Sequence, residues 1–260
     1  MPLTYGSYLR LDELLSLQTP VSEGPEHDEM LFIVIHQVYE LWFKEILHEL
    51  DHLQDLLAAD DTPRALHTLK RVLTVLKVLV AQIDVLETMT PLEFLSFRDR
   101  LESGSGFQSF QFRALEFALG QKRESAVRHY PEGSPARRML EERFRRPTVW
   151  DSFLHYLARR GYDVPRSLLE RDVTRPVEPS PEVQRILIRI YRNDPTVTGV
   201  CERLVDMDEG VQEWRYRHVK MVERTIGSKR GTGGSTGAEY LRGTLFRPAF
   251  PDLWAIRTEL

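Results

Sequence analysis

The fold is decided by residues 27–57, which read HDEMLFIVIHQVYELWFKEILHELDHLQDLL. Apolar side chains in this stretch recur every three or four residues, which is the spacing of an α-helix. They form two stripes, one with Leu31, Ile35, Val38, Trp42, Ile46 and Leu50, and one with Phe32, His36, Tyr39, Phe43 and Leu47. Because the two stripes make the first half of the helix apolar nearly all round, we predict a helix in the middle of a bundle. We place its start at Pro25, directly after Gly24.

Helical spacing dominates the rest of the chain as well. A second long helix is predicted from Leu66 to Ile83, and a last one from Leu204 to Thr225 with its end at Gly227. Shorter helices are predicted over residues 91–101, 107–119, 135–144 and 148–159, the third of them with Ser134 as its N-cap. No run shows the alternating pattern of a strand. The sequence therefore predicts an all-α fold, a helical bundle with long central helices and short auxiliary helices.

The stretch at residues 174–181, TRPVEPSP, is rich in proline and could mark a domain boundary. We interpret it as a loop, because a helical pattern resumes at Glu182 and the C-terminal half alone offers few candidate core residues. Residues 1–260 are therefore predicted to form one domain.

Composition is ordinary for a globular protein, with 42% hydrophobic and 28% charged residues. The formal net charge of −4 gives no basic excess for a nucleic-acid backbone. Cys201 is the only cysteine, so no disulfide can form within the chain. The N-terminus lacks the layout of a signal peptide, and the longest apolar run, from Met30 to Ile35, is too short to cross a bilayer. We expect a cytoplasmic protein without nucleic-acid or membrane partners.

Two of the eight histidines, His36 and His218, lie on apolar faces of long helices. Either one alone is more often an ordinary core residue. Together, on two central helices, they favour a site, because burial keeps imidazole neutral and neutral imidazole binds metals or accepts hydrogen bonds. An iron porphyrin between two helices would take one histidine as axial ligand and leave the other on its opposite face.

Arg98 and the glycine-rich loop at residues 231–237 each allow two interpretations. An arginine in the apolar string FLSFR (residues 94–98) is more often a surface residue than a clamp for a carboxylate. The loop is either a plain connector or a mobile lid, and it lacks the Gly-Lys-Ser/Thr ending of a phosphate-binding loop.

The residues Glu45, His48, Glu49 and His52 have the spacing of a di-iron bundle motif. Such a site needs a second Glu-x-x-His on a facing helix, and the only other one lies on this same helix. We therefore interpret these residues as a solvated or interface-facing helix surface.

Four strings resemble signatures of the tryptophan 2,3-dioxygenase family. They are residues 5–9 (YGSYL), residues 27–44 (HDEMLFIVIHQ continuing through YELWFK), residues 105–113 (SGFQS and then QFR), and residues 214–218 (WRYRH) followed by residues 229–235 (KRGTGGS). They occur in the family's order and span nearly the whole chain. The resemblance is weakest between Gly120 and Cys201.

The resemblance implies a haem site. His218 would be the proximal ligand of the iron, and His36 would be the distal histidine, hydrogen-bonded to the indole N–H. One wall of the pocket would be formed by Phe32, Ile33, Val34, Ile35 and His36, with Phe32 packed on the indole.

The same resemblance implies how the rest of the substrate is held. Arg98 would clamp the substrate carboxylate, beside Phe94, where bacterial relatives often have a tyrosine. Thr232 would bind the amino-acid end beside a haem propionate. Ser105 and Gly106 would lie close to bound dioxygen. Tyr5 and Tyr8 would reach into the pocket of a neighbouring subunit. Residues 1–20 would therefore contact a neighbour, and a homotetramer is expected.

The implied activity is the insertion of O2 into the C2–C3 bond of L-tryptophan, giving N-formyl-L-kynurenine in the first step of the kynurenine route of tryptophan catabolism. The implied cofactor is haem b, ferrous in the active state. Three alternatives stay open: a related haem enzyme acting on another indole or aromatic amino acid, a haem-binding sensor or carrier, and a metal-free helical interaction protein. The amino-acid clamp argues against a gas sensor.

Overall fold

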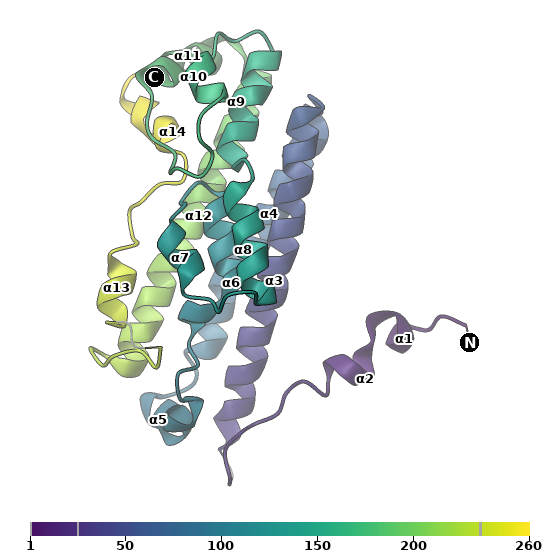
Figure 1. Ribbon diagram of the computed structural model, residues 1–260, viewed down its shortest axis with the longest axis vertical. Helices are drawn as coiled ribbons and strands as arrows, with labels where there is room; N and C mark the ends of the chain where they lie inside the picture. Colours follow the sequence, from purple (N-terminus) through teal and green to yellow (C-terminus); the bar gives the residue numbers. More distant parts are fainter. Residues whose placement is uncertain (1, 25, 234–235) are drawn as a thin grey trace.

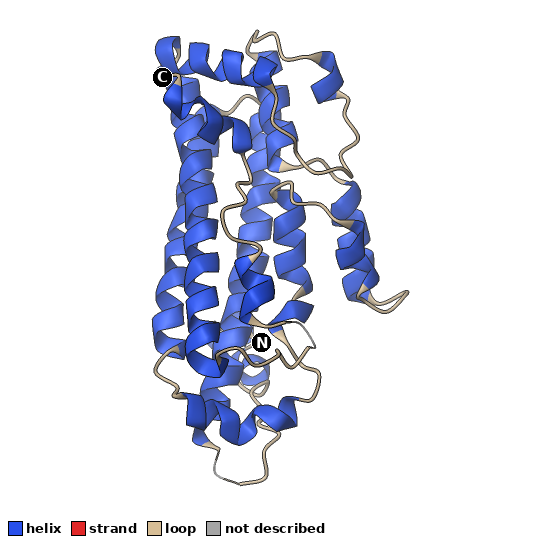
Figure 2. Cartoon of the chain, turned by 90° about the vertical axis from the view of Figure 1, so that its left-hand side faces the viewer, coloured by secondary structure: helices blue, strands red, loops and turns tan. Residues whose placement is uncertain are grey.

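The computed structural model describes residues 2–24, 26–233 and 236–260, and over these residues it contains helices, turns and loops but no strand (Figures 1 and 2). The all-α prediction is confirmed. The elements are α1 (Tyr5–Leu9), α2 (Leu11–Leu14), α3 (His27–Ala58), α4 (Thr62–Leu86), α5 (Pro91–Phe97), η1 (Arg98–Leu101), η2 (Gly106–Gln108), α6 (Phe110–Ala118), α7 (Glu124–Arg128), α8 (Pro135–Arg145), α9 (Val149–Arg159), α10 (Arg166–Leu169), α11 (Pro181–Asn193), α12 (Pro195–Ile226), α13 (Ala238–Arg242), α14 (Pro251–Ala255) and η3 (Ile256–Thr258).

Three long helices, α3, α4 and α12, run side by side along the long axis of the molecule (Figure 1). Helix α4 packs along both α3 and α12. Their facing side chains belong to one buried cluster that also includes residues of α6, α8, α9, α11 and α14. This cluster continues on both sides of the proline-rich stretch at residues 174–181. The assignment of residues 1–260 to one domain stays a prediction.

Helix ends follow local capping chemistry. Ser134 accepts a hydrogen bond from the backbone N–H of Arg137, as predicted for the start of α8. Helix α11 begins at Pro181, one residue before the predicted restart, with Ser180 as its N-cap. Helix α12 begins at Pro195, well before the predicted Leu204, because Asp194 caps two backbone N–H groups there. The predicted start of α3 at Pro25 lies outside the described residues.

The predicted helix over residues 91–101 is an α-helix only to Phe97 and then tightens into a 3-10 turn. The predicted helix over residues 107–119 is likewise divided, into a 3-10 turn and α6. The shortest α-helices of the C-terminal half, α10, α13 and α14, have too few residues for a periodic pattern to reveal them.

The N-terminal arm, residues 2–22, carries α1 and α2 away from the bundle (Figure 1). Its base is tied to α3, since the Glu29 carboxylate accepts hydrogen bonds from the backbone N–H groups of Val21 at 2.7 Å and Ser22 at 3.1 Å. Among the described residues, none of the helices combines the length and the apolar character that crossing a membrane requires.

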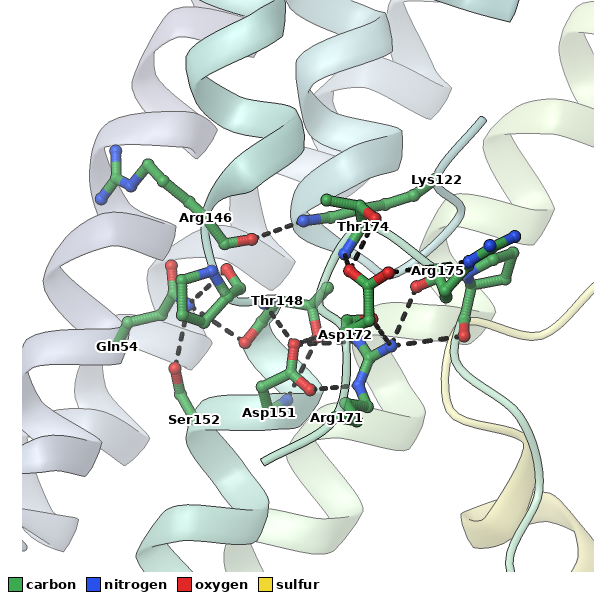
Figure 3. Close-up of polar contacts among 12 residues, drawn as sticks. Gln54, Lys122, Arg146, Thr148, Asp151, Ser152, Arg171, Asp172, Thr174 and Arg175 are labelled. Atoms are coloured by element: carbon green, nitrogen blue, oxygen red, sulfur yellow. Dashed lines mark hydrogen bonds and ion pairs between the residues drawn. The ribbon is translucent and has the colours of Figure 1, made fainter. Parts of the chain in front are cut away.

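At the other end of the bundle, a polar network fastens the loop that precedes α11 (Figure 3). The Asp151 carboxylate accepts hydrogen bonds from Arg171 Nε at 2.5 Å and Nη2 at 3.0 Å, and Arg171 Nη1 donates to the Arg175 carbonyl at 2.9 Å. Nearby, Lys122 Nζ donates to the carbonyls of Phe144, at 2.8 Å, and Arg146. Burial lowers the pKa of the Lys122 amine to about 8. These contacts join the start of α9 to the loop that precedes α11.

Candidate active site

A cavity of about 250 Å³ lies between α3 and α12, bordered by α5, α6 and the glycine-rich loop. The sequence-predicted site residues on its lining are Phe32, His36, Phe94, Arg98, Ser105, Gly106, His218 and Thr232. These residues come from segments far apart in the chain, and the fold brings them to one place.

His36 is held by its own helix. Its Nδ1 lies 2.7 Å from the carbonyl oxygen of Phe32, one turn earlier. A carbonyl can only accept, so Nδ1 carries the proton and Nε2 is left as a hydrogen-bond acceptor. Burial lowers the pKa of His36, against opposing effects of the Phe32 carbonyl and the Glu40 carboxylate. The imidazole is therefore neutral near pH 7, with a defined tautomer.

His218 on α12 is also neutral. Burial, and then the neighbouring His36 and Arg113, lower the pKa of its imidazole to about 4. Among the described residues, neither ring nitrogen of His218 forms a hydrogen bond with a protein group. Its ring stacks on Trp214, with the centroids 5.2 Å apart and the planes 3° from parallel. A neutral imidazole with free nitrogens on a cavity wall is suited to bind a metal.

Arg98 and Thr232 meet where the glycine-rich loop covers the cavity. Arg98 Nη2 donates to the carbonyl of Arg230 at 2.5 Å, and Thr232 Oγ1 donates to the carbonyl of Gly104 at 2.5 Å. Within the described part of the chain, Arg98 has no carboxylate partner. The cavity wall thus presents a cation without a counter-ion, which favours the carboxylate clamp over an ordinary surface arginine.

The close approach of the glycine-rich loop to Ser105 depends on Gly233. A Cβ atom at this position would lie 2.7 Å from the Ser105 Cβ, closer than two carbon atoms can pack. The loop therefore lies over the cavity in contact with residues 103–105, as a lid does. The Gly234 and Ser235 positions of the predicted loop lie outside the described residues.

Five predicted site residues lie away from the cavity lining. Ile35 is buried in the core, Val34 is 38% exposed, and Ile33 is half-buried elsewhere on α3. Successive residues of a helix point in different directions, so of the five predicted wall residues 32–36 only Phe32 and His36, one turn apart, share the cavity face. Tyr5 and Tyr8, on the arm, are 76% and 70% exposed and do not reach this chain's own cavity.

Sequence reasoning missed a buried charge cluster beside the cavity. The Glu116 carboxylate pairs with Arg113 at 2.5 Å, Arg123 at 2.7 Å and Arg215 at 2.9 Å. Three guanidinium groups thus share one carboxylate, which leaves excess positive charge. Arg113 and Arg215 lie inside the strings that resemble the family signatures, at residues 105–113 and 214–218. Their place in these strings is the sequence feature that could have pointed to the cluster.

The cavity fits an iron porphyrin with its two carboxylates. Neutral His218 offers an axial ligand, and a largely apolar wall surrounds it, with Ile83, Leu86, Met221 and Val222 among its residues. Excess positive charge around Glu116, beside this apolar wall, suits a planar ligand with acidic side groups.

The di-iron alternative finds no support in the described residues, which contain no group of three potential metal ligands. His48 and His52 are exposed, as expected for a helix surface. Glu49 instead faces a neighbouring helix: its side chain is buried and pairs with Arg71 of α4 at 2.6 Å. The neighbouring helix supplies the charge that makes this burial possible.

Comparisons with known proteins agree with the motifs. A family model described as tryptophan 2,3-dioxygenase matches residues 1–141 and 182–260. A protein of that name from Herpetosiphon aurantiacus is 63% identical over 258 residues, covering 99% of this chain and 98% of its own. Similar proteins of the same name from Anaeromyxobacter sp. (strain K) and Caulobacter vibrioides are 59% and 47% identical, each covering 99% of this chain, and 96% and 98% of their own lengths. The unmatched residues 142–181 include Asp151 and Arg171 of the polar network in Figure 3.

Proposed function

Because the chain belongs to the tryptophan 2,3-dioxygenase family, we propose that the cavity between α3 and α12 is its active site. The reaction inserts both atoms of O2 across the C2–C3 bond of L-tryptophan and gives N-formyl-L-kynurenine, the first step of the kynurenine route of tryptophan catabolism. The observation that carries the placement is the convergence of two neutral histidines, His36 and His218, with the unpaired cation of Arg98.

The proposed cofactor is haem b, with His218 as its axial ligand. Ferrous haem would supply the iron at which O2 becomes reactive toward the electron-rich indole double bond. The excess positive charge around Glu116 supports the accommodation of its carboxylates.

His36 would position the indole ring. Its Nδ1 is occupied by the Phe32 carbonyl, so Nε2 is available to accept a hydrogen bond from the indole N–H. The rings of Phe94 and Phe97 lie 5.7 Å and 5.5 Å from that of Phe32 and form an aromatic wall on which an indole can pack. A fixed tautomer and a fixed wall orient the C2–C3 bond before reaction.

Arg98 and Thr232 would hold the amino-acid end of the substrate. Both donate to loop carbonyls in this structure, and these hydrogen bonds would be exchanged for contacts with the carboxylate and the amino-acid end. Free indole offers no such exchange, so it is selected against. Phe94 lacks the hydroxyl that a tyrosine would offer to the substrate carboxylate. Arg98 would therefore supply a larger share of the carboxylate binding. Ser105 and Gly106, on the same lining, would lie near bound O2.

The N-terminal arm supports the proposed homotetramer. Its apolar side chains are largely exposed, with Leu3 at 76%, Tyr5 at 76%, Leu15 at 72% and Tyr8 at 70%. Large exposed apolar side chains gathered on one segment mark an interaction site. Docking of the arm onto a neighbour would bring Tyr5 and Tyr8 to that subunit's pocket. We also propose a cytoplasmic location, which suits a chain whose only cysteine, Cys201, is buried and unpaired.

The test is a spectrum and a turnover assay on the purified, hemin-loaded and reduced protein. We expect a haem Soret band, and N-formyl-L-kynurenine absorbance that appears only when L-tryptophan and O2 are both present. A panel of substituted indoles and other aromatic amino acids distinguishes the related-enzyme alternative. Absence of product from a fully haem-loaded protein would refute the proposal.

A further inference from the structure

Trp214 has an unusual relation to the proposed iron ligand. It precedes His218 by one turn of α12, and the two rings are nearly parallel, at 3°, with centroids 5.2 Å apart. A contact of this kind restricts rotation of the imidazole about its bond to the helix, because turning the ring out of plane drives its edge into the indole face.

A metal-bound histidine is normally oriented by a hydrogen bond from its second ring nitrogen to a carboxylate, a carbonyl or water. His36 shows that arrangement in this cavity, with Nδ1 on the Phe32 carbonyl. Among the described residues, no protein group plays this part for His218. Within residues 2–24, 26–233 and 236–260, the aromatic ring that packs on His218 is that of Trp214.

Trp214 is itself held by rings from other helices. Phe112 of α6 lies 4.9 Å away, and Phe43 and Tyr39 of α3 meet it edge to face at 5.9 Å and 6.1 Å. The indole also has a polar contact with the Tyr39 hydroxyl of α3, so ring packing and this contact together fix it. The plane presented to His218 is therefore set by α3 and α6 together.

We propose that Trp214 is a positioning residue that orients the imidazole of His218 for iron binding by stacking, the part that a protein hydrogen-bond partner plays for His36. The inference rests on the proposed function, since it takes His218 as the haem ligand. It adds a specific role for α3 and α6, which carry no iron ligand but fix the plane of the one on α12.

The test compares Trp214→Phe, Trp214→Leu and Trp214→Met in the hemin-loaded protein. The readouts are the iron–histidine stretching band of the reduced protein and the rate of haem transfer to apomyoglobin. We expect the phenylalanine variant to keep a single sharp band. The leucine and methionine variants should give a shifted, broadened band and lose haem roughly 10-fold faster. Methionine, which is flexible and fills irregular space, serves if the leucine variant does not fold.

Phe107→Leu is the matched control, because Phe107 lines the same cavity but packs on His129 and Tyr240 and not on His218. Its band should match the wild-type band. The proposed role of Trp214 would be overturned, with the haem ligand unaffected, by either of two results. One is a wild-type band in the leucine or methionine variant, and the other is an equal shift of the band in the phenylalanine and leucine variants. A wild-type protein without any iron–histidine band would instead overturn the proposed haem ligand.

Discussion

At the scale of single residues, the two histidines of the cavity differ in what surrounds them. Burial lowers the pKa of both, but His36 also has the Phe32 carbonyl and the Glu40 carboxylate, which oppose the shift. For His218 every resolved effect acts in the same direction. One ring is therefore neutral with a fixed tautomer, and the other is neutral with both nitrogens free of protein partners. The first suits hydrogen bonding to a substrate, and the second suits a metal.

Replacement of Arg98 tests the carboxylate clamp. In Arg98→Ala the KM for L-tryptophan should rise by about 10- to 100-fold, because hydrogen bonds to a charged group are lost and nearby donors cannot replace them. Arg98→Lys should recover only part of the loss, since lysine cannot form a two-pronged contact. Haem content, read from the Soret band, should not change. An unchanged KM in Arg98→Ala would exclude this role.

The lowered pKa of His218 predicts how the stability of the haem-free protein depends on pH. The folded pKa, about 4, is below the ordinary value of 6.5, so the unfolded chain binds the proton first as pH falls. Stability should therefore decrease between pH 6.5 and pH 4, by at most about 3 kcal/mol from this group. Urea unfolding at pH 7.5 and pH 5 measures the loss, which should be smaller in His218→Gln. Equal losses in the two proteins would contradict the assignment.

At the scale of elements, the site depends on how two segments meet over the cavity. Residues 98–106 follow α5, and the glycine-rich loop follows α12. Two hydrogen bonds and the contact of Gly233 with Ser105 join these segments. Arg98 and Thr232, which are proposed to grip the substrate, thus also join the two segments in this structure, and substrate binding would exchange these hydrogen bonds for contacts with the substrate.

Gly233→Ala tests this closure. The added Cβ would meet Ser105, so the loop must shift, and kcat/KM for L-tryptophan should fall roughly 10- to 100-fold. Adding Ser105→Gly to the same chain removes the opposing Cβ and should restore much of the loss relative to Ser105→Gly alone. Strictly additive effects of the two substitutions would show that this contact does not control closure.

At the scale of the whole molecule, the bundle and the arm have different roles. The bundle buries its core within one chain, whereas the arm leaves its apolar side chains exposed and is tied to the bundle only at its base. In the proposed homotetramer, an arm of this kind would gain its stabilising contacts from another copy of the chain.

Removal of residues 1–18 tests that role. We expect light scattering to show an assembly smaller than the full-length tetramer, while circular dichroism shows nearly the same helical content. Turnover should fall because Tyr5 and Tyr8 no longer complete a neighbour's pocket. The double variant Tyr5→Ser with Tyr8→Ser, which keeps the arm, separates assembly from pocket contacts. An intact tetramer with full activity after truncation would contradict the proposal.

Local sequence determined the elements and the chemistry of the site. The stripes on residues 27–57 predicted the central helix, Ser134 predicted a helix start, and His36, His218 and Arg98 were identified from the faces and strings that carry them. Periodicity reports which residues share one face of a helix, and capping acts within one turn, so both can be read without a fold.

Tertiary structure decided which of these residues contact one another and which charged side chains are buried. Only Phe32 and His36 of the predicted wall reach the cavity, and Glu49 is buried because Arg71 approaches from α4. Glu116 pairs with Arg215 of α12 as well as with Arg113 and Arg123, which are near it in the chain. Whether a charge can be buried, and which ring another ring stacks on, depends on partners distant in the chain. Such pairings come from the packing of α3, α4, α6 and α12, and no local pattern encodes them.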